Sequence, residues 1–160
     1  MKKIVILAMV LSILSAPCCA VKEIVKTDLN SFNQDPEQYK DKRVIITTEI
    51  ESILKDPTSF IKRDIEISGL VRRNPRGFEW GFSIRDEKGN SLECYETEYR
   101  ISPWLRVDQA IKRAELKKEK VTVVGKLGTG LQIELDWIEY EGDVMDTDFK
   151  PNTGFYWLRW

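Results

Sequence analysis

Residues 63–95 read RDIEISGLVRRNPRGFEWGFSIRDEKGNSLECY, and apolar and polar side chains alternate along most of this stretch. A period of two places alternate side chains on one face of an extended chain. The apolar face holds Ile65, Ile67, Val71, Phe78, Trp80, Phe82, Ile84, Leu92 and Cys94. Residues 86–90, Asp-Glu-Lys-Gly-Asn, have the composition of a hairpin turn. The stretch therefore predicts three consecutive antiparallel strands with one buried face.

A helix and a second hairpin follow these strands. Ser102 and Pro103 suit a helix start, and an apolar stripe then recurs at helical spacing at Trp104, Val107, Ile111 and Ala114. Residues 120–127 and 131–141 again have strand character, and Gly128-Thr129-Gly130 joins them. Three strands, a helix and a two-stranded hairpin predict a five-stranded Greek-key barrel over residues 63–142, with the helix between strands three and four. The expected fold class is α+β, mainly β.

The sequence of residues 48–141 also resembles a known family. Asp56-Pro57 followed by Phe60, then ISGLV at 67–71, then FSIRD at 82–86 with Gly89, is similar to OB-fold modules of the anticodon-binding/helicase type. Such modules occur in small exported bacterial proteins of uncharacterised function. The resemblance rests on strand and turn residues and includes no catalytic motif. It implies an OB-like barrel with a ligand-binding face, and it leaves the ligand open.

Residues 21–62, ahead of the barrel, contain an internal repeat with a spacing of 21 residues. The repeat aligns Asp35-Pro36 with Asp56-Pro57, and it aligns Thr27 with Thr48, Phe32 with Ile53, Tyr39 with Phe60 and Val44 with Ile65. Each copy predicts a short helix capped by its threonine, reinforced in the second copy by Glu51, then a turn and a strand. Two copies are too few for a solenoid, so the segment is expected to be helix-turn-strand. Whether strand 43–47 joins the barrel stays open.

The first twenty residues have the order of a secretory signal peptide. Lys2 and Lys3 precede the apolar run 4–14, and small residues follow around Cys18 and Ala20. We expect cleavage after Ala20 and an exported, periplasmic or envelope protein. Lipid attachment at Cys18 or Cys19 is the alternative, and only that would bring the chain to a membrane. Cleavage after Ala20 would leave Cys94 as the one cysteine, expected to be buried and inert.

Composition excludes several kinds of chemistry. The chain has 160 residues with 25 Lys+Arg, 26 Asp+Glu and no histidine, which removes Ser-His and Cys-His catalysis and the commonest zinc ligand. Loss of Lys2 and Lys3 would change the net charge from −1 to −3. Asp143, Asp146 and Asp148 lack the glycine and glutamate of a calcium loop. No catalytic site, metal or cofactor is expected, and the protein is not expected to be an enzyme.

A binding face is expected where the outward side of strands two and three meets the loops 73–77 and 128–130. Its candidate residues are Arg73, Arg76, Glu79, Glu93, Tyr95 and Lys126, which are expected to be neighbours. Their alternative interpretation is a solvated strand face, because outward polar residues are common on any one-sided sheet. The rest of the outer face is expected to be acidic, with Glu66, Glu134 and Asp136.

These observations favour an exported, non-enzymatic OB-fold module that binds a protein or glycan partner in the cell envelope. An acidic face repels phosphates, so an exported nucleic-acid-binding OB protein is the second hypothesis. Residues 143–160 are expected to form an acidic and then aromatic tail, with four aromatic side chains in residues 155–160. That aromatic end would fold back on the barrel or dock on a partner or membrane interface.

Overall fold

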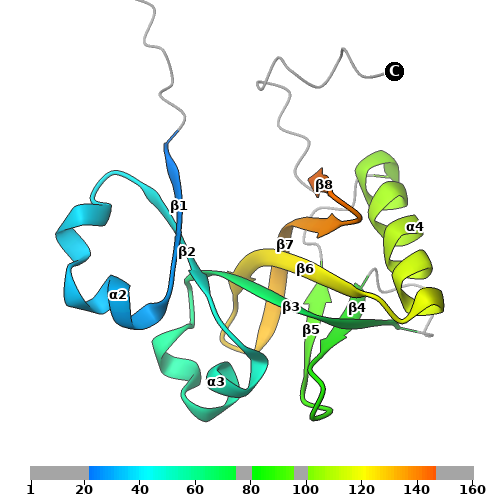
Figure 1. Cartoon of the computed structure of the whole chain (residues 1–160), viewed down its shortest axis with the longest axis horizontal. Coiled ribbons are helices and arrows are strands. Elements are labelled where there is room, and N and C mark those ends of the chain that lie inside the picture. The colour runs from blue at the N-terminus through cyan, green and yellow to red at the C-terminus, as the bar shows by residue number, and fades with distance from the viewer. Residues whose placement is uncertain (1–21, 75–80, 96–100, 147–160) are drawn as a thin grey trace, which may run out of the picture.

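Five strands close into a barrel (Figure 1). The computed structural model describes residues 22–74, 81–95 and 101–146. The barrel strands are β3 (Asp64–Arg73), β4 (Gly81–Arg85), β5 (Ser91–Tyr95), β6 (Lys120–Leu127) and β7 (Gln132–Tyr140). Their order is β3-β4-β5-β7-β6, and β6 pairs back onto β3. All these pairs are antiparallel except β5–β7. The predicted fold class is confirmed.

The barrel is strongly staggered and its interior is filled with side chains. Following the register from Arg73 across Phe82, Cys94 and Ile133 leads to Leu127. The Leu127 amide donates to the carbonyl of Arg63, ten residues before the starting point on the same stretch of chain. The apolar face expected from the sequence is buried where the structure describes it, at Ile65, Ile67, Val71, Phe82, Ile84, Leu92 and Cys94. The barrel is therefore a packed core rather than a container for a ligand.

Helix α4 (Ile101–Lys117) connects β5 to β6 and packs against the barrel, as expected (Figure 1). Val107, Ile111 and Ala114 are fully buried, together with Ala110. The 3.6-residue spacing of these side chains explains why a mostly charged helix has one face that the barrel can cover. Among the described helices, none is long and apolar enough to cross a lipid bilayer.

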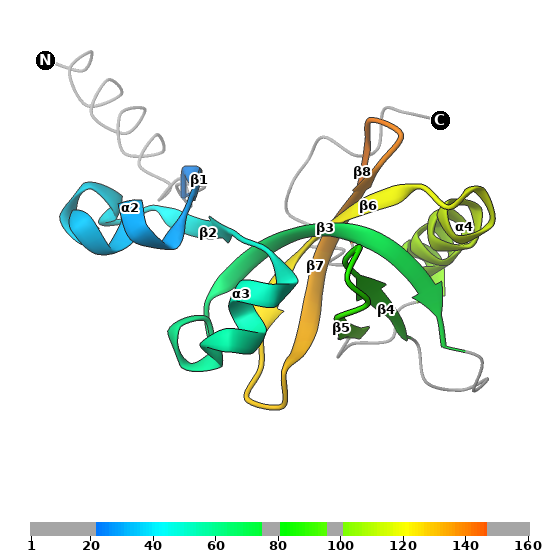
Figure 2. The same ribbon diagram turned by 60° about the horizontal axis from the view of Figure 1, so that its bottom comes forward.

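The predicted repeat forms an N-terminal arm and the approach to β3 (Figure 2). Its elements are β1 (Ile24–Thr27), α2 (Leu29–Gln34), the 3-10 turn η1 (Pro36–Tyr39), β2 (Arg43–Thr47), α3 (Ile50–Lys55) and the 3-10 turn η2 (Pro57–Ser59). We call residues 22–47 the arm. β1 pairs with β2, and β2 with β3, both in parallel. Strand 43–47 therefore extends the sheet from β3 and is not one of the five barrel strands.

The two copies of the repeat have matching backbones. Asp35 (φ −144°, ψ 77°) ends α2 as Asp56 (φ −139°, ψ 74°) ends α3. Asp41 and Lys62, again 21 residues apart, both have left-handed conformations, with φ of 63° and 65°. The same turn therefore leads into β2 and into β3, and this determines where the residues before each strand lie.

Some expected details of these elements are wrong. The helix caps lie one residue later than the threonines: Asp28 Oδ1 accepts from the Ser31 amide at 2.9 Å, and Glu49 precedes α3 without a side-chain cap. Glu51 is not part of a capping box, because it pairs with Lys55 at 2.9 Å and with Lys88.

Two four-residue strands, β1 and β8 (Asp143–Asp146), were not expected. β8 pairs with β7, so the sheet extends past residue 142 into the predicted tail. The predicted signal peptide, Arg76, Glu79 and the aromatic end of the chain lie outside the described residues.

Candidate functional site

The structure brings part of the expected binding face together. Tyr95 on β5 is the register partner of Glu134 on β7, and Glu134 is the partner of Lys126 on β6. Glu93 lies beside Gln132 in the same ladder. Tyr95 is half-buried and outside the core. Glu93, Tyr95 and Lys126 therefore lie within two strands of one another, on either side of Glu134.

Arg73 lies elsewhere. It ends β3, whereas Lys126 pairs with Asp64 at the start of the same strand. The Arg73 Nε donates to Glu115 Oε2 of α4 at 3.1 Å, and its amide donates to Glu115 Oε1 at 3.3 Å. The expectation that Arg73 and Lys126 are neighbours is not met, because the long, curved β3 separates them.

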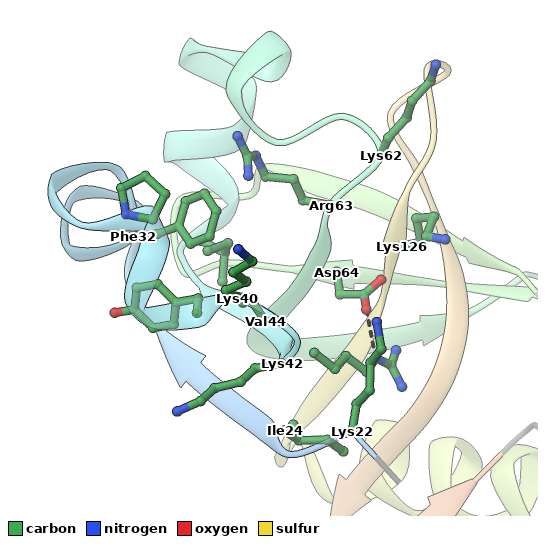
Figure 3. Close-up of a pocket in the computed structure, with 14 residues that line it drawn as sticks. Lys22, Ile24, Phe32, Lys40, Lys42, Val44, Lys62, Arg63, Asp64 and Lys126 are labelled. Atoms are coloured by element: carbon green, nitrogen blue, oxygen red, sulfur yellow. Dashed lines mark hydrogen bonds and ion pairs between the residues drawn. The ribbon is translucent and has the colours of Figure 1, made fainter. Parts of the chain in front are cut away.

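A basic groove lies where the arm meets the barrel, and Lys126 belongs to it (Figure 3). The groove has a volume of about 710 Å³. Seven cationic side chains line it against one carboxylate, that of Asp64: Lys22, Lys40, Lys42, Arg43, Lys62, Arg63 and Lys126. Such an excess of positive charge contrasts with the net charge of −1 of the whole chain.

The parallel pairing of the repeat explains why these cations lie along one groove. Parallel strands begin at the same edge of a sheet, so the residues before β1, β2 and β3 lie side by side. The Arg43 amide donates to the Glu23 carbonyl at 2.9 Å, which joins the starts of β1 and β2. The Lys62 amide donates to the Leu127 carbonyl at 2.7 Å, which joins the start of β3 to the end of β6. The basic turns ahead of β2 and β3 thus face one groove.

Three of the seven cations are already engaged. Arg43 Nε donates to Asp64 Oδ2 at 2.7 Å and its Nη2 donates to Asp136, while the guanidinium carbon lies 5.2 Å from the centroid of the Trp137 ring. Lys42 is 3.4 Å from Glu23. Arg63 donates to the Ser59 carbonyl at 2.8 Å.

The other four cations are Lys22, Lys40, Lys62 and Lys126, and within the described part of the chain none of them has an acidic partner. Figure 3 shows Lys62 and Lys126 on the side of the groove opposite Phe32. These four ammonium groups give the groove its uncompensated charge.

The aromatic side chains of the groove have partners of their own. The rings of Phe32 and Tyr39 pack at 5.5 Å between centroids, and the Arg63 guanidinium lies 4.9 Å from the Phe32 centroid. The Tyr39 hydroxyl is hydrogen-bonded to Thr27 Oγ1 at 3.0 Å. These rings form part of the wall of the groove and are half-buried, so only part of each ring is open to a stacking base.

The predicted acidic outer face is partly neutralised by the arm. Glu66 pairs with Lys26, and Asp136 pairs with Arg43. The bonds to Glu66, opposed by partial burial and helped by Glu139 at 3.2 Å, raise the pKa of Lys26. Cations from one segment thus cancel carboxylates from another, which no single stretch of sequence reveals.

The groove has the chemistry of an anion-binding site. Its one carboxylate, Asp64, is committed to Arg43. Across the described residues, no group of three or more potential metal ligands occurs. Cys94 is buried, and desolvation raises the pKa of its thiol, so it behaves as a core residue. Charge attraction to an anionic group is what this arrangement offers.

No protein-family model matches this chain, and no curated protein matches it.

Proposed function

We propose that this protein is an exported, non-enzymatic binding module of the OB-fold type that holds an anionic protein or glycan of the cell envelope. The observation that carries the proposal is a set of four lysines that face one groove and have no acidic partner among the described residues, Lys22, Lys40, Lys62 and Lys126. Keeping like charges together costs free energy in the absence of a counter-charge. An anionic partner would supply that counter-charge.

The strand order supports the OB-fold assignment, and the position of Lys126 relates the groove to that fold. The barrel order β3-β4-β5-β7-β6, closed by β3–β6, with α4 between the third and fourth barrel strands, follows the expected pattern. Lys126 is two residues ahead of the loop 128–130, one of the two loops that frame the binding face of OB modules. The basic groove therefore adjoins the place where such modules commonly bind.

The residues of the groove support a binding role without catalysis. A general acid or base is usually a histidine, lysine or carboxylate with a shifted pKa and a polar orienting partner. The chain has no histidine, and Asp64 is neutralised by Arg43. Export is supported by the sequence order of residues 1–20 alone.

The basic groove also favours the second hypothesis, an exported nucleic-acid-binding protein, more than the sequence did. Phosphates would suit the same lysines. Aromatic stacking, which contributes about 1–3 kcal/mol per base in single-strand binders, is restricted in this groove because Tyr39 and Arg63 pack against Phe32. We therefore place an acidic protein or glycan ahead of nucleic acid.

Retention on a heparin resin tests the proposed function. The purified protein is expected to bind at low salt in spite of its net negative charge, and to elute as salt screens the lysines. The Lys40→Gln/Lys62→Gln double variant is expected to elute at clearly lower salt. The Lys112→Gln/Lys118→Gln variant is the matched control, since it removes the same charge from exposed positions outside the groove.

Flow-through of the wild-type protein at low salt would contradict the proposed function. Equal loss of retention in the two double variants would contradict the groove as its site. Thermal unfolding of each variant confirms that the fold is intact.

A further inference from the structure

The cations of the basic groove form a row across four adjacent chain segments, and this row bears on the kind of ligand. We infer that the ligand is a linear acidic glycan that lies across the ends of β1, β2, β3 and β6, and not a compact anion. This inference rests on the proposed function, because it concerns the ligand of the same groove.

The row follows from the pairing of the strands. Lys22 precedes β1, Lys42 precedes β2, and Lys62 and Arg63 precede β3. Lys126, on β6, is the register partner of Asp64 on β3. Neighbouring strands lie about 4.8 Å apart, so four strand ends extend over roughly 14 Å. That length, together with the volume of about 710 Å³, fits several units of an extended chain. A single small anion would contact only part of the row.

The uncompensated positive charges are separated along the row, which suits spaced anionic groups. Lys22 precedes β1 at one end of the row, whereas Lys126 lies on β6 at the other end, next to the start of β3 that Lys62 precedes. Between them, Arg43 and Asp64 cancel each other through a bond of 2.7 Å. A compact anion is best held by converging donors, whereas this groove separates its uncompensated charges with a neutral pair. Charges that recur along a polymer match that spacing.

The remaining lining favours a sugar chain over a nucleic acid. Ile24 is 49% exposed, and Ile24, Pro36 and Val44 give the groove apolar surface that the C–H faces of sugar rings can cover. The Asp64 carboxylate can accept a bond from a hydroxyl group. The rings of Phe32 and Tyr39, in contrast, are half-buried and packed against each other, which restricts the stacking of a base on them. The groove thus combines spaced ammonium groups with apolar and hydrogen-bonding surface.

Calorimetric titration with oligogalacturonates of increasing length tests the inference. These probes carry one carboxylate per sugar and differ only in length. We expect the hexasaccharide to bind at least about tenfold more tightly than the disaccharide, because it reaches both ends of the row. Neutral maltohexaose should not bind. Lys62→Gln and Lys126→Gln should each weaken hexasaccharide binding several-fold and lower its salt dependence by about one ion.

The matched control is Lys112→Gln on α4, an exposed lysine without an acidic partner among the described residues, which should bind like the wild type. Equal affinity for the disaccharide and the hexasaccharide would overturn the linear ligand. Tighter binding of an oligothymidylate than of an oligogalacturonate of equal charge would overturn the inference that the ligand is a glycan. In both cases retention on heparin would stand, so these failures are distinct from failure of the proposed function.

Discussion

Arg43 is the residue that couples the arm to the barrel. It lies on β2, yet its guanidinium contacts Asp64 of β3 and Asp136 of β7 and lies 5.2 Å from the centroid of Trp137. The side chain is 31% exposed, and Asp64 is 17% exposed. Partly buried ion pairs with good geometry stabilise more than surface pairs, because water screens them less.

Replacing Arg43 by methionine is therefore expected to lower the free energy of unfolding by about 1–2 kcal/mol. The loss arises because two carboxylates remain half-buried without their shared cation. Urea unfolding measures it. Arg113→Met is the control. Arg113 is 57% exposed and its contact with Glu141 is long, at 3.9 Å, so the free energy of unfolding of this variant should stay within about 0.5 kcal/mol of the wild type. Equal effects of the two variants would contradict this role of Arg43.

Glu51 is a half-buried carboxylate that is paired with two lysines. Bonds from Lys88 and then Lys55 lower the pKa of Glu51 to about 2. Because the folded-state pKa is below the unfolded one, the two pairs favour the folded state above about pH 4.3, and this contribution fades as pH falls towards 2.

A carboxyl-carbon NMR titration is expected to give Glu51 a midpoint near pH 2, and Lys88→Gln should raise that midpoint towards the ordinary value. Lys112→Gln should leave it unchanged. A midpoint close to that of an ordinary glutamate in the wild-type protein would show that the pair between α3 and the β4–β5 hairpin does not persist in solution.

At the scale of elements, the close antiparallel pairing of β6 with β7 depends on a glycine. The register of these strands shifts between Val124 and Gly125, and a Cβ at Gly125 would lie 2.2 Å from the Glu134 carbonyl oxygen. Gly125→Ala is therefore expected to destabilise the protein by about 1–3 kcal/mol, through displacement of backbone. Thermal or urea unfolding measures the change.

Gly130→Ala is the matched control for this prediction. Gly130 lies in the β6–β7 loop, and a Cβ there would have its nearest neighbour, Gln132 Oε1, at 4.0 Å. The variant should stay within about 0.5 kcal/mol of the wild type. If Gly125→Ala proved equally mild, the close approach of β6 and β7 would have to be wider than the structure has it.

The elements differ in how far the sequence predicts them, for physical reasons. The five barrel strands and α4 each bury one face, which imposes a period of two or 3.6 on their sequences. β1 and β8 have four residues each, too few for a period to appear, and β8 is rich in aspartate. Their pairing with neighbouring strands makes them extended, and local sequence does not encode that pairing.

The basic groove was missed for a related reason. The repeat shows that the stretches before β2 and β3 are equivalent, and both contain cations, at Lys42 and Arg63. Only the parallel pairing of β1, β2 and β3 places those stretches at one edge. An expectation of parallel strands from the repeat would have brought Lys22, Lys42 and Lys62 together. Lys126 comes from a distant strand, and the barrel closure alone adds it to the groove.

At the scale of the whole molecule, the expected export makes a prediction about the mature chain. The order of residues 1–20 predicts signal cleavage after Ala20, so the intact mass of the exported protein is expected to correspond to a chain that begins at Val21. A lipid-modified chain that begins at Cys18 or Cys19 would indicate a lipoprotein instead. A full-length chain that stays in the cytoplasm would contradict export.

The strand pairing that joins the arm to the barrel is short, and this has a thermodynamic consequence. β2 pairs with β3 over residues 45–47, whereas Lys40 of the groove belongs to the arm and Lys126 to the barrel. A ligand that contacts both can bind only while β2 is paired with β3, so by mass action it stabilises that pairing. At a hundred times its dissociation constant this amounts to about 2.7 kcal/mol. Ligand binding is then expected to slow the exchange of the amide protons of β1 and β2 with solvent, because the bound ligand keeps the arm paired with the barrel.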